Sequence, residues 1–389
     1  MKRSRPTSTG RRRRPGRSFS FPTTALRVVR WYAAAAAAAA AALHHTAAAA
    51  PAATAYGDPG ETAAKRGREL VAASTTPRQQ QGAAATEGES PYRGRSAYGF
   101  FDIGEHCTPS SLWDREVDAA SYELGCDEIE GMLESKSRFV GEGRVRRVTL
   151  VEHEGRTVAV KELRDRGSAR LHRLEVVTMD ALRGNPNLVQ LLGVCNTTVV
   201  TEAFATDIQS AMKKRAGTLP VRSAVSMSLD GARGLQALHE ASIVHYDIKP
   251  AQMLIADDDL GGGGGGELRV KLNDFNVAFF MSSTPDGTPC PFTVKGGLQL
   301  GPWRTPEYLA QKPMTEKVDI YRMGMVFKKY LANGGVHFRG HDGGASDFDT
   351  AEHRSYNTVV HDMIEEDAER RPSARQVAER LEAILQDLS

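Results

Sequence analysis

The sequence is poor in cysteine and lacks the patterns by which sulfur binds metal. Its 389 residues include four cysteines, Cys107, Cys126, Cys195 and Cys290, with no Cys-x-x-Cys pair and no His and Cys spacing typical of zinc ligands. A structural zinc site is therefore not expected. If the chain is secreted, Cys107 and Cys126 are close enough in sequence to form a disulfide ahead of the main domain; four free thiols are the alternative.

Acidic residues are missing from the N-terminal part of the chain. Residues 1–57 contain no Asp or Glu but ten Lys and Arg, so the whole-chain net charge of +2 hides a basic leader and an acidic body. A long unbroken apolar run is missing too, because His44 and His45 interrupt a stretch of weakly apolar alanines. We therefore expect no stable membrane span. No nucleic-acid partner is expected either.

The leader nevertheless has the layout of a targeting sequence. Four arginines at positions 11–14 precede an apolar segment that runs from residue 31 to about 53 and contains many small residues. This layout predicts a secretory signal or signal anchor over residues 1–53, the segment through which any membrane contact is expected. A plastid or mitochondrial transit peptide, a nuclear-localisation cluster, or an untargeted cytoplasmic protein are the alternatives.

Large apolar side chains are scarce over residues 54–98, where Ala, Gly, Thr, Gln and Pro dominate. Such a composition cannot bury enough apolar surface to offset the entropy of ordering, so it predicts a disordered linker. Residues 99–135 mix apolar and acidic residues and predict a short helical lead-in to the main domain. The lead-in shows no residue pattern that indicates chemistry.

Beyond the lead-in the pattern changes from strands to helices. Alternation and apolar runs predict five strands, over residues 138–140, 144–152, 157–163, 188–195 and 198–201. One helix is predicted between the third and fourth strands, and later helices at about 207–215, 221–239, 318–331, 356–366 and 373–388. The fold is thus expected to be α+β, with a small β lobe and one main helix over 136–204 and a larger, mostly helical lobe over 205–388.

Two features of the β part point to phosphate chemistry. Gly141 and Gly143 lie between the first two strands, where glycine lets backbone N–H groups approach phosphate oxygens closely; a plain hairpin turn is the alternative. Lys161 ends the third strand, and a buried lysine needs a partner. Glu175 on the following helix, predicted at about 168–183, is the candidate, and an ordinary ion pair is the simpler interpretation.

The stretch 243–255 carries a carboxylate, an ammonium and a carboxamide in close succession. Asp247, Lys249 and Gln252 stand at offsets of two and five residues, at the exit of a predicted helix. Asp247 could accept or orient a substrate hydroxyl, while Lys249 could neutralise charge on a moving phosphoryl group. Gln252 and Asp274, which follows a later strand, together offer oxygens suited to Mg²⁺.

The order of these parts resembles that of eukaryotic protein kinases over about residues 136–388. The matching residues are Gly141, Gly143, Val158-Ala159-Val160-Lys161, Glu175, His245, Asp247, Lys249-Pro250, Asp274-Phe275, Thr305-Pro306-Glu307, Asp319 and Arg371. The resemblance implies the bilobal kinase fold, ATP and Mg²⁺ as cofactors, and a protein substrate. It is closest to a divergent branch, some members of which carry secretory signals.

The resemblance also implies a role for each matching residue. Lys161 holds the α- and β-phosphates and pairs with Glu175, Asp247 is the catalytic base, Lys249 steadies the γ-phosphate, and Asp274 holds Mg²⁺ with Gln252. The implied nucleotide contacts are Gly141, Gly143, Val148, Ala159 and Leu254, with Thr201 behind the adenine and Glu202, Ala203 and Phe204 as the hinge. An apolar column of Leu191, Met179, Phe275 and His245 anchored by Asp319, and a buried Glu307–Arg371 ion pair, are implied as structural features.

Four positions depart from the family pattern. Gln252 replaces the usual metal-binding asparagine, and Asn276 replaces the glycine after Asp-Phe, where a residue that tolerates positive φ is expected. Tyr246 replaces the arginine that binds a phosphorylated activation loop, so we expect no activation by that route. Arg146 replaces the third glycine of the phosphate loop and is expected to stiffen it and to add charge over the nucleotide.

Three functions follow as hypotheses. The first is transfer of the γ-phosphoryl group of ATP to a protein Ser or Thr hydroxyl, since Lys249-Pro250 resembles the serine/threonine type, although residues 188–195 resemble tyrosine-kinase-like sequences. The second is a pseudokinase that binds nucleotide or partners without efficient catalysis, in view of Gln252, Asn276 and Arg146. The third is a glycan or small-molecule kinase of the secretory pathway.

Overall fold

The computed structural model describes residues 101–103, 106–143, 145–214, 219–256, 268–294, 303–332 and 350–388. These residues belong to one compact unit, Glu69–Ser389. The predicted leader (1–53) and linker (54–98) lie outside the described residues, as do the ends of several predicted loops. Within the described residues no helix is long and apolar enough to span a membrane.

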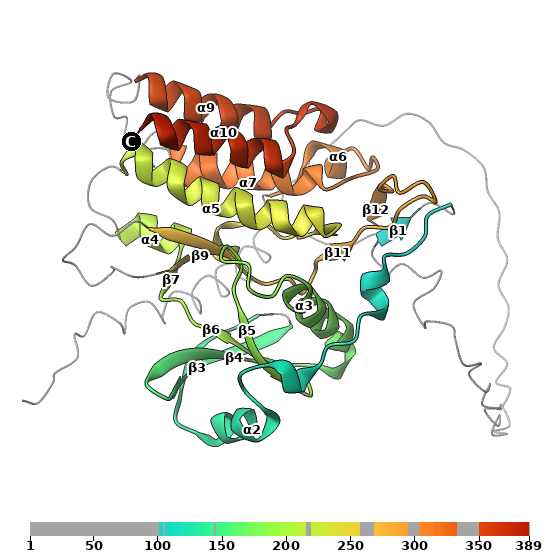
Figure 1. The fold of residues 1–389 in the computed structure, drawn as a ribbon, viewed down its shortest axis with the longest axis vertical. Coiled ribbons are helices and arrows are strands. Elements are labelled where there is room, and N and C mark those ends of the chain that lie inside the picture. The colour runs from blue at the N-terminus through green and yellow to red at the C-terminus, as the bar shows by residue number, and fades with distance from the viewer. Residues whose placement is uncertain are drawn as a thin grey trace, which may run out of the picture. The chain divides into compact units, whose positions relative to one another are not determined.

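A five-stranded antiparallel sheet forms the first part of the fold (Figure 1). Its strands are β2 (Ser137–Glu142), β3 (Arg146–His153), β4 (Arg156–Leu163), β5 (Leu191–Cys195) and β6 (Thr198–Glu202), in the order β2-β3-β4-β6-β5. Glu154 and Gly155 both have positive φ, 49° and 81°, and form the two-residue turn that joins β3 to β4. The five predicted strands are confirmed to within a few residues.

Strand β5 begins three residues after its predicted start at residue 188. Residues 188–190 do not join the sheet because Leu188 forms an isolated bridge with Leu272, and the N–H of Val189 donates to the carbonyl of Leu272 at 2.9 Å. This segment therefore connects the sheet to the helical part of the fold. The main helix of the β part, α3 (Ala169–Ala181), precedes it and buries Leu174, Val177 and Met179.

The second part is mainly helical (Figure 1). Its helices are α4 (Ile208–Lys214), α5 (Val221–Glu240), α6 (Pro306–Leu309), α7 (Lys317–Tyr330), α9 (Ala351–Met363) and α10 (Ala374–Asp387), with short 3-10 turns at Pro250–Gln252 and Ala368–Arg370. A further 3-10 turn, Arg166–Ser168, lies in the first part directly before α3. Helix α5 packs against α10, and α7 against α9. Helix α9 begins five residues before its predicted start because the hydroxyl of Thr350 accepts the N–H of His353 and caps it there.

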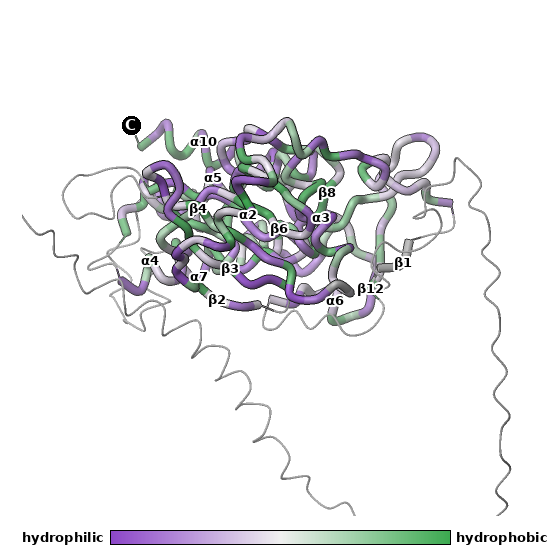
Figure 2. Tube along the Cα trace, turned by 90° about the horizontal axis from the view of Figure 1, so that it is seen from below, coloured by the Kyte–Doolittle hydropathy of each residue, from purple (hydrophilic) through white to green (hydrophobic). Residues whose placement is uncertain are grey.

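Short strands connect the two parts and position the loops between them. β7 (Thr206–Asp207), β9 (Met253–Ala256) and β10 (Arg269–Leu272) form one small sheet, and β8 (Ile243–Val244) pairs with β11 (Phe279–Phe280). Apolar residues of both parts form one continuous buried cluster. Figure 2 shows hydrophobic and hydrophilic residues interspersed along the helices and strands of both parts.

The predicted lead-in is helical only at its end, in α2 (Cys126–Glu134). Two 3-10 turns, Ser111–Asp114 and Ala119–Ser121, precede it. Ahead of them, β1 (Phe101–Ile103) pairs antiparallel with β12 (Phe292–Val294), nearly two hundred residues later in the sequence. The lead-in thus crosses from one part of the fold to the other.

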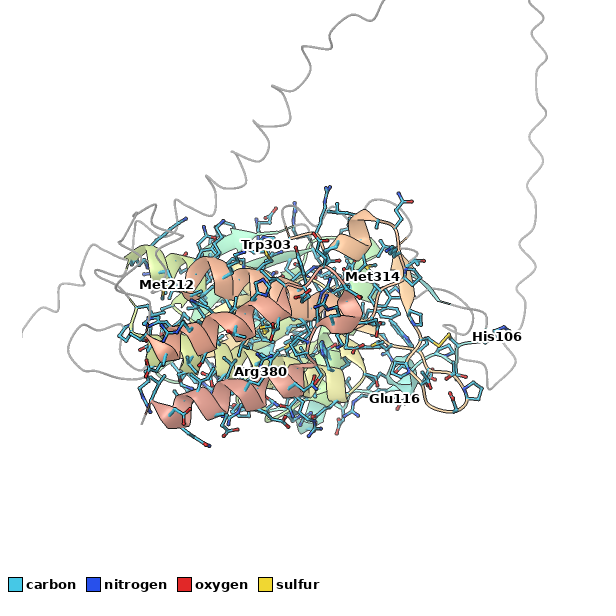
Figure 3. All side chains as sticks on the ribbon, turned by 90° about the horizontal axis from the view of Figure 1, so that it is seen from above. His106, Glu116, Met212, Trp303, Met314 and Arg380 are labelled. Carbon is cyan, nitrogen blue, oxygen red and sulfur yellow. A yellow bond between two sulfur atoms is a disulfide. The ribbon has the colours of Figure 1, made fainter. Side chains whose placement is uncertain are left out.

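The expected Cys107–Cys126 disulfide is wrong, and so is the alternative of four free thiols. Cys107 is bonded to Cys290, and Cys126 to Cys195. The disulfide of Cys107 lies close to the labelled His106 in Figure 3. The lead-in separates Cys107 from Cys126 because it runs along α3, so each cysteine meets a partner that is distant in sequence.

Candidate active site

Strand β4 and helix α3 bring the predicted lysine and glutamate together. The Nζ of Lys161 lies 3.1 Å from Oε1 of Glu175, and both side chains are buried. The same Nζ donates to Oδ1 of Asn273 at 2.9 Å, next to Asp274 in the chain. Lys161 is thereby aimed at the place where β10 ends, beside Asp274.

Arg146 does not occupy the place expected for it. Its guanidinium is buried, with Nε 3.0 Å and Nη2 2.7 Å from Oε2 of Glu175. Alternation along β3 explains this, because Arg147 points to solvent and its neighbour must point to the α3 face of the sheet. The expectation that Arg146 adds charge over the nucleotide is therefore wrong.

Two pKa shifts follow from this cluster of charges. Burial alone raises the pKa of Glu175, but the charges of Lys161 and Arg146 and their hydrogen bonds outweigh it and hold the pKa at about 2. Burial, followed by the charge of Arg146, lowers the pKa of His172 to about 4, so its ring is neutral at pH 7 and its Nδ1 accepts from Arg146 at 2.8 Å. Glu175 is thus an anion that forms ion pairs with two cations, Lys161 and Arg146.

The loop that follows β8 is fixed through its backbone. The N–H groups of His245 and Tyr246 donate to the two carboxylate oxygens of Asp319, at 2.7 and 2.9 Å. Tyr246 has a positive φ of 62°, its carbonyl accepts from Arg322, and the guanidinium of Arg322 lies 4.5 Å from its ring centroid. The position that normally binds a loop phosphate is therefore filled by a buried aromatic ring.

This loop presents the predicted catalytic residues on one side. The Nζ of Lys249 lies 2.5 Å from Oδ2 of Asp247, and both side chains keep partial exposure to solvent. The amide Nε2 of Gln252 donates to Oδ2 of Asp274 at 2.8 Å and approaches Oδ2 of Asp247 at 3.4 Å. The structure thus brings together the four residues that the sequence placed in one site.

The oxygen donors at this site suit Mg²⁺. Burial raises the pKa of Asp274, and the carboxylates of Glu175 and Asp247 raise it further while Lys161 and Lys249 oppose them, so a divalent cation there relieves crowded negative charge. In the described part of the chain no three His, Cys, Asp or Glu side chains form a metal cluster. Asp274 would therefore hold Mg²⁺ together with phosphate oxygens, and Gln252 would join it through its amide oxygen once the amide, whose nitrogen faces Asp274 here, is turned.

The predicted nucleotide contacts come from neighbouring strands. Gly141 on β2 faces Val148 on β3, and Ala159 on β4 pairs with Thr201 on β6, which is buried. Gly143 forms the turn before β3, where its N–H donates to the carbonyl of Arg146 at 2.8 Å. Leu254 lies on β9, half-buried. Ala203 follows β6 directly, and the carboxylate of Glu202 binds Nζ of Lys271 at 2.7 Å.

The expected structural features are also present. His245 lies 5.3 Å from Phe275 between ring centroids, and both belong to the buried interior with Met179 and Leu191. Arg371 binds Glu307 through two hydrogen bonds of 2.8 Å each, and both side chains are buried. The reason given for Asn276 is wrong, because the residue with positive φ is Asp274, at 67°.

Three contributors to the site were not predicted. Arg146 was expected to belong to the phosphate loop and to add charge over the nucleotide, and Asn273 and Arg322 were not singled out. Strict alternation from Arg147 would have turned Arg146 inward, and Asn273 is adjacent to Asp274 in the sequence. No sequence pattern indicates that Arg322 would reach the carbonyl of Tyr246.

The chain belongs to the protein kinase family, since the protein kinase domain matches residues 135–383. It therefore has the bilobal α+β fold of that family, with the five-stranded sheet in the small lobe.

Among curated relatives, it is 30% identical over 152 residues to the serine/threonine/tyrosine-protein kinase HT1 of Arabidopsis thaliana, which covers 36% of this chain and 34% of that protein. It is 29% identical over 229 residues to the PTI1-like tyrosine-protein kinase 1 of Arabidopsis thaliana (54% and 60%) and 27% identical over 295 residues to its serine/threonine-protein kinase 12 (70% and 59%). The chain thus spans between 34% and 60% of the length of these relatives.

Proposed function

We propose that this chain is an ATP- and Mg²⁺-dependent protein kinase that transfers the γ-phosphoryl group to a Ser or Thr hydroxyl of a protein. The observation that carries the proposal is the pairing of Lys249 with Asp247 at 2.5 Å, beside Asp274 and Gln252. Lys161 and Glu175 are paired in the same structure, so each group needed for phosphoryl transfer has its partner.

The residues divide the chemistry in the following way. Lys161 binds the α- and β-phosphates, and Glu175 keeps its Nζ from turning away. Asp247 accepts a hydrogen bond from the substrate hydroxyl and takes its proton as the oxygen bonds to the γ-phosphorus. The bond between that phosphorus and the oxygen bridging it to the β-phosphate breaks, and ADP leaves. Lys249 neutralises charge on the transferred group. Bound Mg²⁺ supplies further neutralisation of the phosphates.

The Ser/Thr preference rests on Lys249. Its ammonium lies 2.5 Å from Oδ2 of Asp247, and the Lys249-Pro250 pair resembles the serine/threonine type. The names of the relatives include serine/threonine and tyrosine kinases alike. The acceptor residue is therefore a point that the assay below must resolve, by analysis of the phosphorylated amino acid.

The decisive measurement is phosphate transfer from labelled ATP to a protein acceptor by the full chain and by its Asp247→Asn form. Loss of the base should lower the rate by about 10²–10⁴-fold. Asp387→Asn, an exposed carboxylate at the end of α10, is the matched control and should retain full activity. Equal incorporation by the unaltered chain and Asp247→Asn would rule out the assignment.

A pseudokinase is the second candidate, and one contact favours it. Gln252 presents its amide nitrogen, not its oxygen, to Asp274. In this orientation the amide hydrogen-bonds the carboxylate that Mg²⁺ needs. A chain that binds Mg-ATP, by a shift of its melting temperature, and transfers no phosphate would support this alternative.

We also propose that the chain folds in the secretory pathway. Both disulfides use all four cysteines, and disulfides persist in oxidising compartments. This agrees with the predicted signal over residues 1–53. A fusion of residues 1–60 to a glycosylation reporter tests the proposal: glycosylation is expected, and a diffuse cytosolic reporter would reject it.

A further inference from the structure

Glu175 carries two cations, one on each carboxylate oxygen. Lys161 binds Oε1 at 3.1 Å, while Arg146 binds Oε2 through both Nε and Nη2. The three residues are at most 7% exposed. An ion pair that satisfies one anion with one cation is neutral, whereas this buried group has one positive charge in excess.

Arg146 also ties α3 to the sheet by contacts that do not involve Glu175. Its Nη1 donates to the carbonyl of Thr197, in the turn between β5 and β6, at 2.9 Å. Its Nη2 lies 2.8 Å from Nδ1 of His172, one helical turn before Glu175 on α3. A single guanidinium therefore joins β3, the β5–β6 turn and two successive turns of α3.

Because of these contacts, Lys161 is not the sole cation that neutralises Glu175. If Lys161 were the sole cation on Glu175, drawing its ammonium toward a phosphate would leave a buried carboxylate with less charge compensation. Here Arg146 compensates the carboxylate whether or not Lys161 is engaged. The positive charge in excess is then available to a nucleotide.

We propose that Arg146 is a positioning residue for nucleotide binding: it neutralises Glu175 and fixes α3, so that the ammonium of Lys161 serves the phosphates of ATP. The inference rests on the proposed kinase function. It assigns Arg146 to the support of Glu175 and α3 instead of to the phosphate loop. Arg146 also fixes α3 without a phosphate on the activation segment, the stretch from Asp274 to Glu307.

The test compares Arg146→Gln with Arg146→Lys and with the control Arg147→Gln. Arg147 is the next residue on β3, is 57% exposed and binds Glu142 at 3.3 Å. Measurements on the full chain are the Kd of Mg-ATP, the KM for ATP against kcat, and backbone hydrogen exchange of α3. Circular dichroism establishes that each variant is folded.

Arg146→Gln should raise the Kd and KM for ATP about tenfold, the effect of losing hydrogen bonds to a charged group, with a smaller change in kcat. Exchange of α3 amides should become faster. Arg146→Lys keeps the charge and should recover part of the affinity, and Arg147→Gln should change neither quantity. Lys161→Met should weaken ATP binding without loosening α3, because Arg146 still holds Glu175.

Unchanged affinity and unchanged α3 exchange in Arg146→Gln would overturn the inference, as would an equal effect of Arg147→Gln. If Arg146→Gln does not fold, Arg146→Lys decides. It must show faster α3 exchange than Lys161→Met, in which Arg146 still holds α3, and a Kd for Mg-ATP above that of the unaltered chain; a Kd equal to that of the unaltered chain overturns the proposal. Failure of the kinase function is separate: a chain that transfers no phosphate but whose ATP affinity falls in Arg146→Gln retains this inference.

Discussion

Gln252 is the residue that best distinguishes an active kinase from a pseudokinase. Its amide nitrogen lies 2.8 Å from Asp274 and 3.4 Å from Asp247, a reach that depends on the methylene by which it exceeds asparagine. The amide therefore bridges two carboxylates. A shorter side chain would not span both of them, and Asp274 would be freed for a cation.

We therefore predict that Gln252→Asn lowers the Mg²⁺ concentration for half-maximal phosphate transfer by about tenfold, the scale on which neighbouring hydrogen bonds affect metal affinity. A magnesium titration of the transfer rate measures it. The control is Gln236→Asn, a half-buried residue of α5 whose amide donates to Glu240. A higher Mg²⁺ requirement in Gln252→Asn would show that the longer amide is itself the better ligand.

Several residues of the site could be predicted from the sequence because their neighbours in the chain fix them. Asp247, Lys249 and Gln252 lie within six residues on one loop, so their proximity needs only a local turn. Arg146 was misplaced because the glycine pattern was given more weight than the alternation of β3. The positive φ belongs to Asp274 and not Asn276, because the chain must turn at the end of β10 before Phe275 enters the core.

At the scale of elements, one buried ion pair joins the short helix α6 to the segment before α10. Arg371 and Glu307 form a bidentate ion pair. Arg371 also donates hydrogen bonds to the carbonyls of Glu365 and Lys317. Burial alone raises the pKa of Glu307, but the hydrogen bonds and charge of Arg371 hold it below its usual value. Glu307 therefore remains an anion at neutral pH and depends on its partner.

Replacing Arg371 with Met is expected to cost about 3–5 kcal/mol in the free energy of unfolding, since it leaves a buried carboxylate without a cation. The matched control is Arg375→Met, which breaks an exposed pair with Glu240 whose side chains are 60% and 49% exposed. Pairs of that kind contribute about 0–1 kcal/mol. Urea unfolding of both variants checks the difference, and equal losses would contradict it.

Elements were easier to predict than the contacts between them. The five strands and α5 were located to within a few residues because period-two alternation and a wide apolar face are visible in the sequence. The start of β5 was placed too early because Leu188 is as apolar as a strand residue but pairs with Leu272 of the other lobe. Tertiary contact, which the sequence does not show, decided that boundary.

At the scale of the whole molecule, the lead-in joins parts that a kinase must hold in register. Its Trp113 ring lies 4.7 Å from that of Phe280, at the start of the activation segment. Arg115 and Tyr122 both bind Asp180 of α3, at 2.7 and 2.6 Å. The sequence predicted a short helical lead-in and none of these contacts, because each partner is at least 58 residues away in the chain.

The disulfide pairs could not be predicted for the same reason. Cys107 and Cys290 are 183 residues apart, and Cys126 and Cys195 are 69 apart. The first bond joins the lead-in to the activation segment, where β1 also pairs with β12. The second joins α2 to β5 within the small lobe. The two bonds therefore offer a matched comparison between two parts of one molecule.

We expect the double variant Cys107→Ser/Cys290→Ser to lose about 2–5 kcal/mol of stability, and Cys126→Ser/Cys195→Ser to lose a similar amount. Their effects on the activation segment should differ. Amide exchange in residues 279–294 should become faster in the first variant alone, and phosphate transfer should fall with it. Thermal unfolding and hydrogen exchange of both variants measure these quantities.

Residues 279–294 are expected to depend on the Cys107–Cys290 bond because Tyr246 cannot bind a phosphate. A kinase with an arginine there can order its activation segment through a phosphate, whereas here a buried tyrosine occupies that place. The Cys107–Cys290 bond, the β1–β12 pairing and the contact of Trp113 with Phe280 supply covalent, backbone and apolar ties to the same segment. If activity and exchange of residues 279–294 were the same in both double variants, the segment would be held by the second lobe alone, and the lead-in would have no part in ordering it.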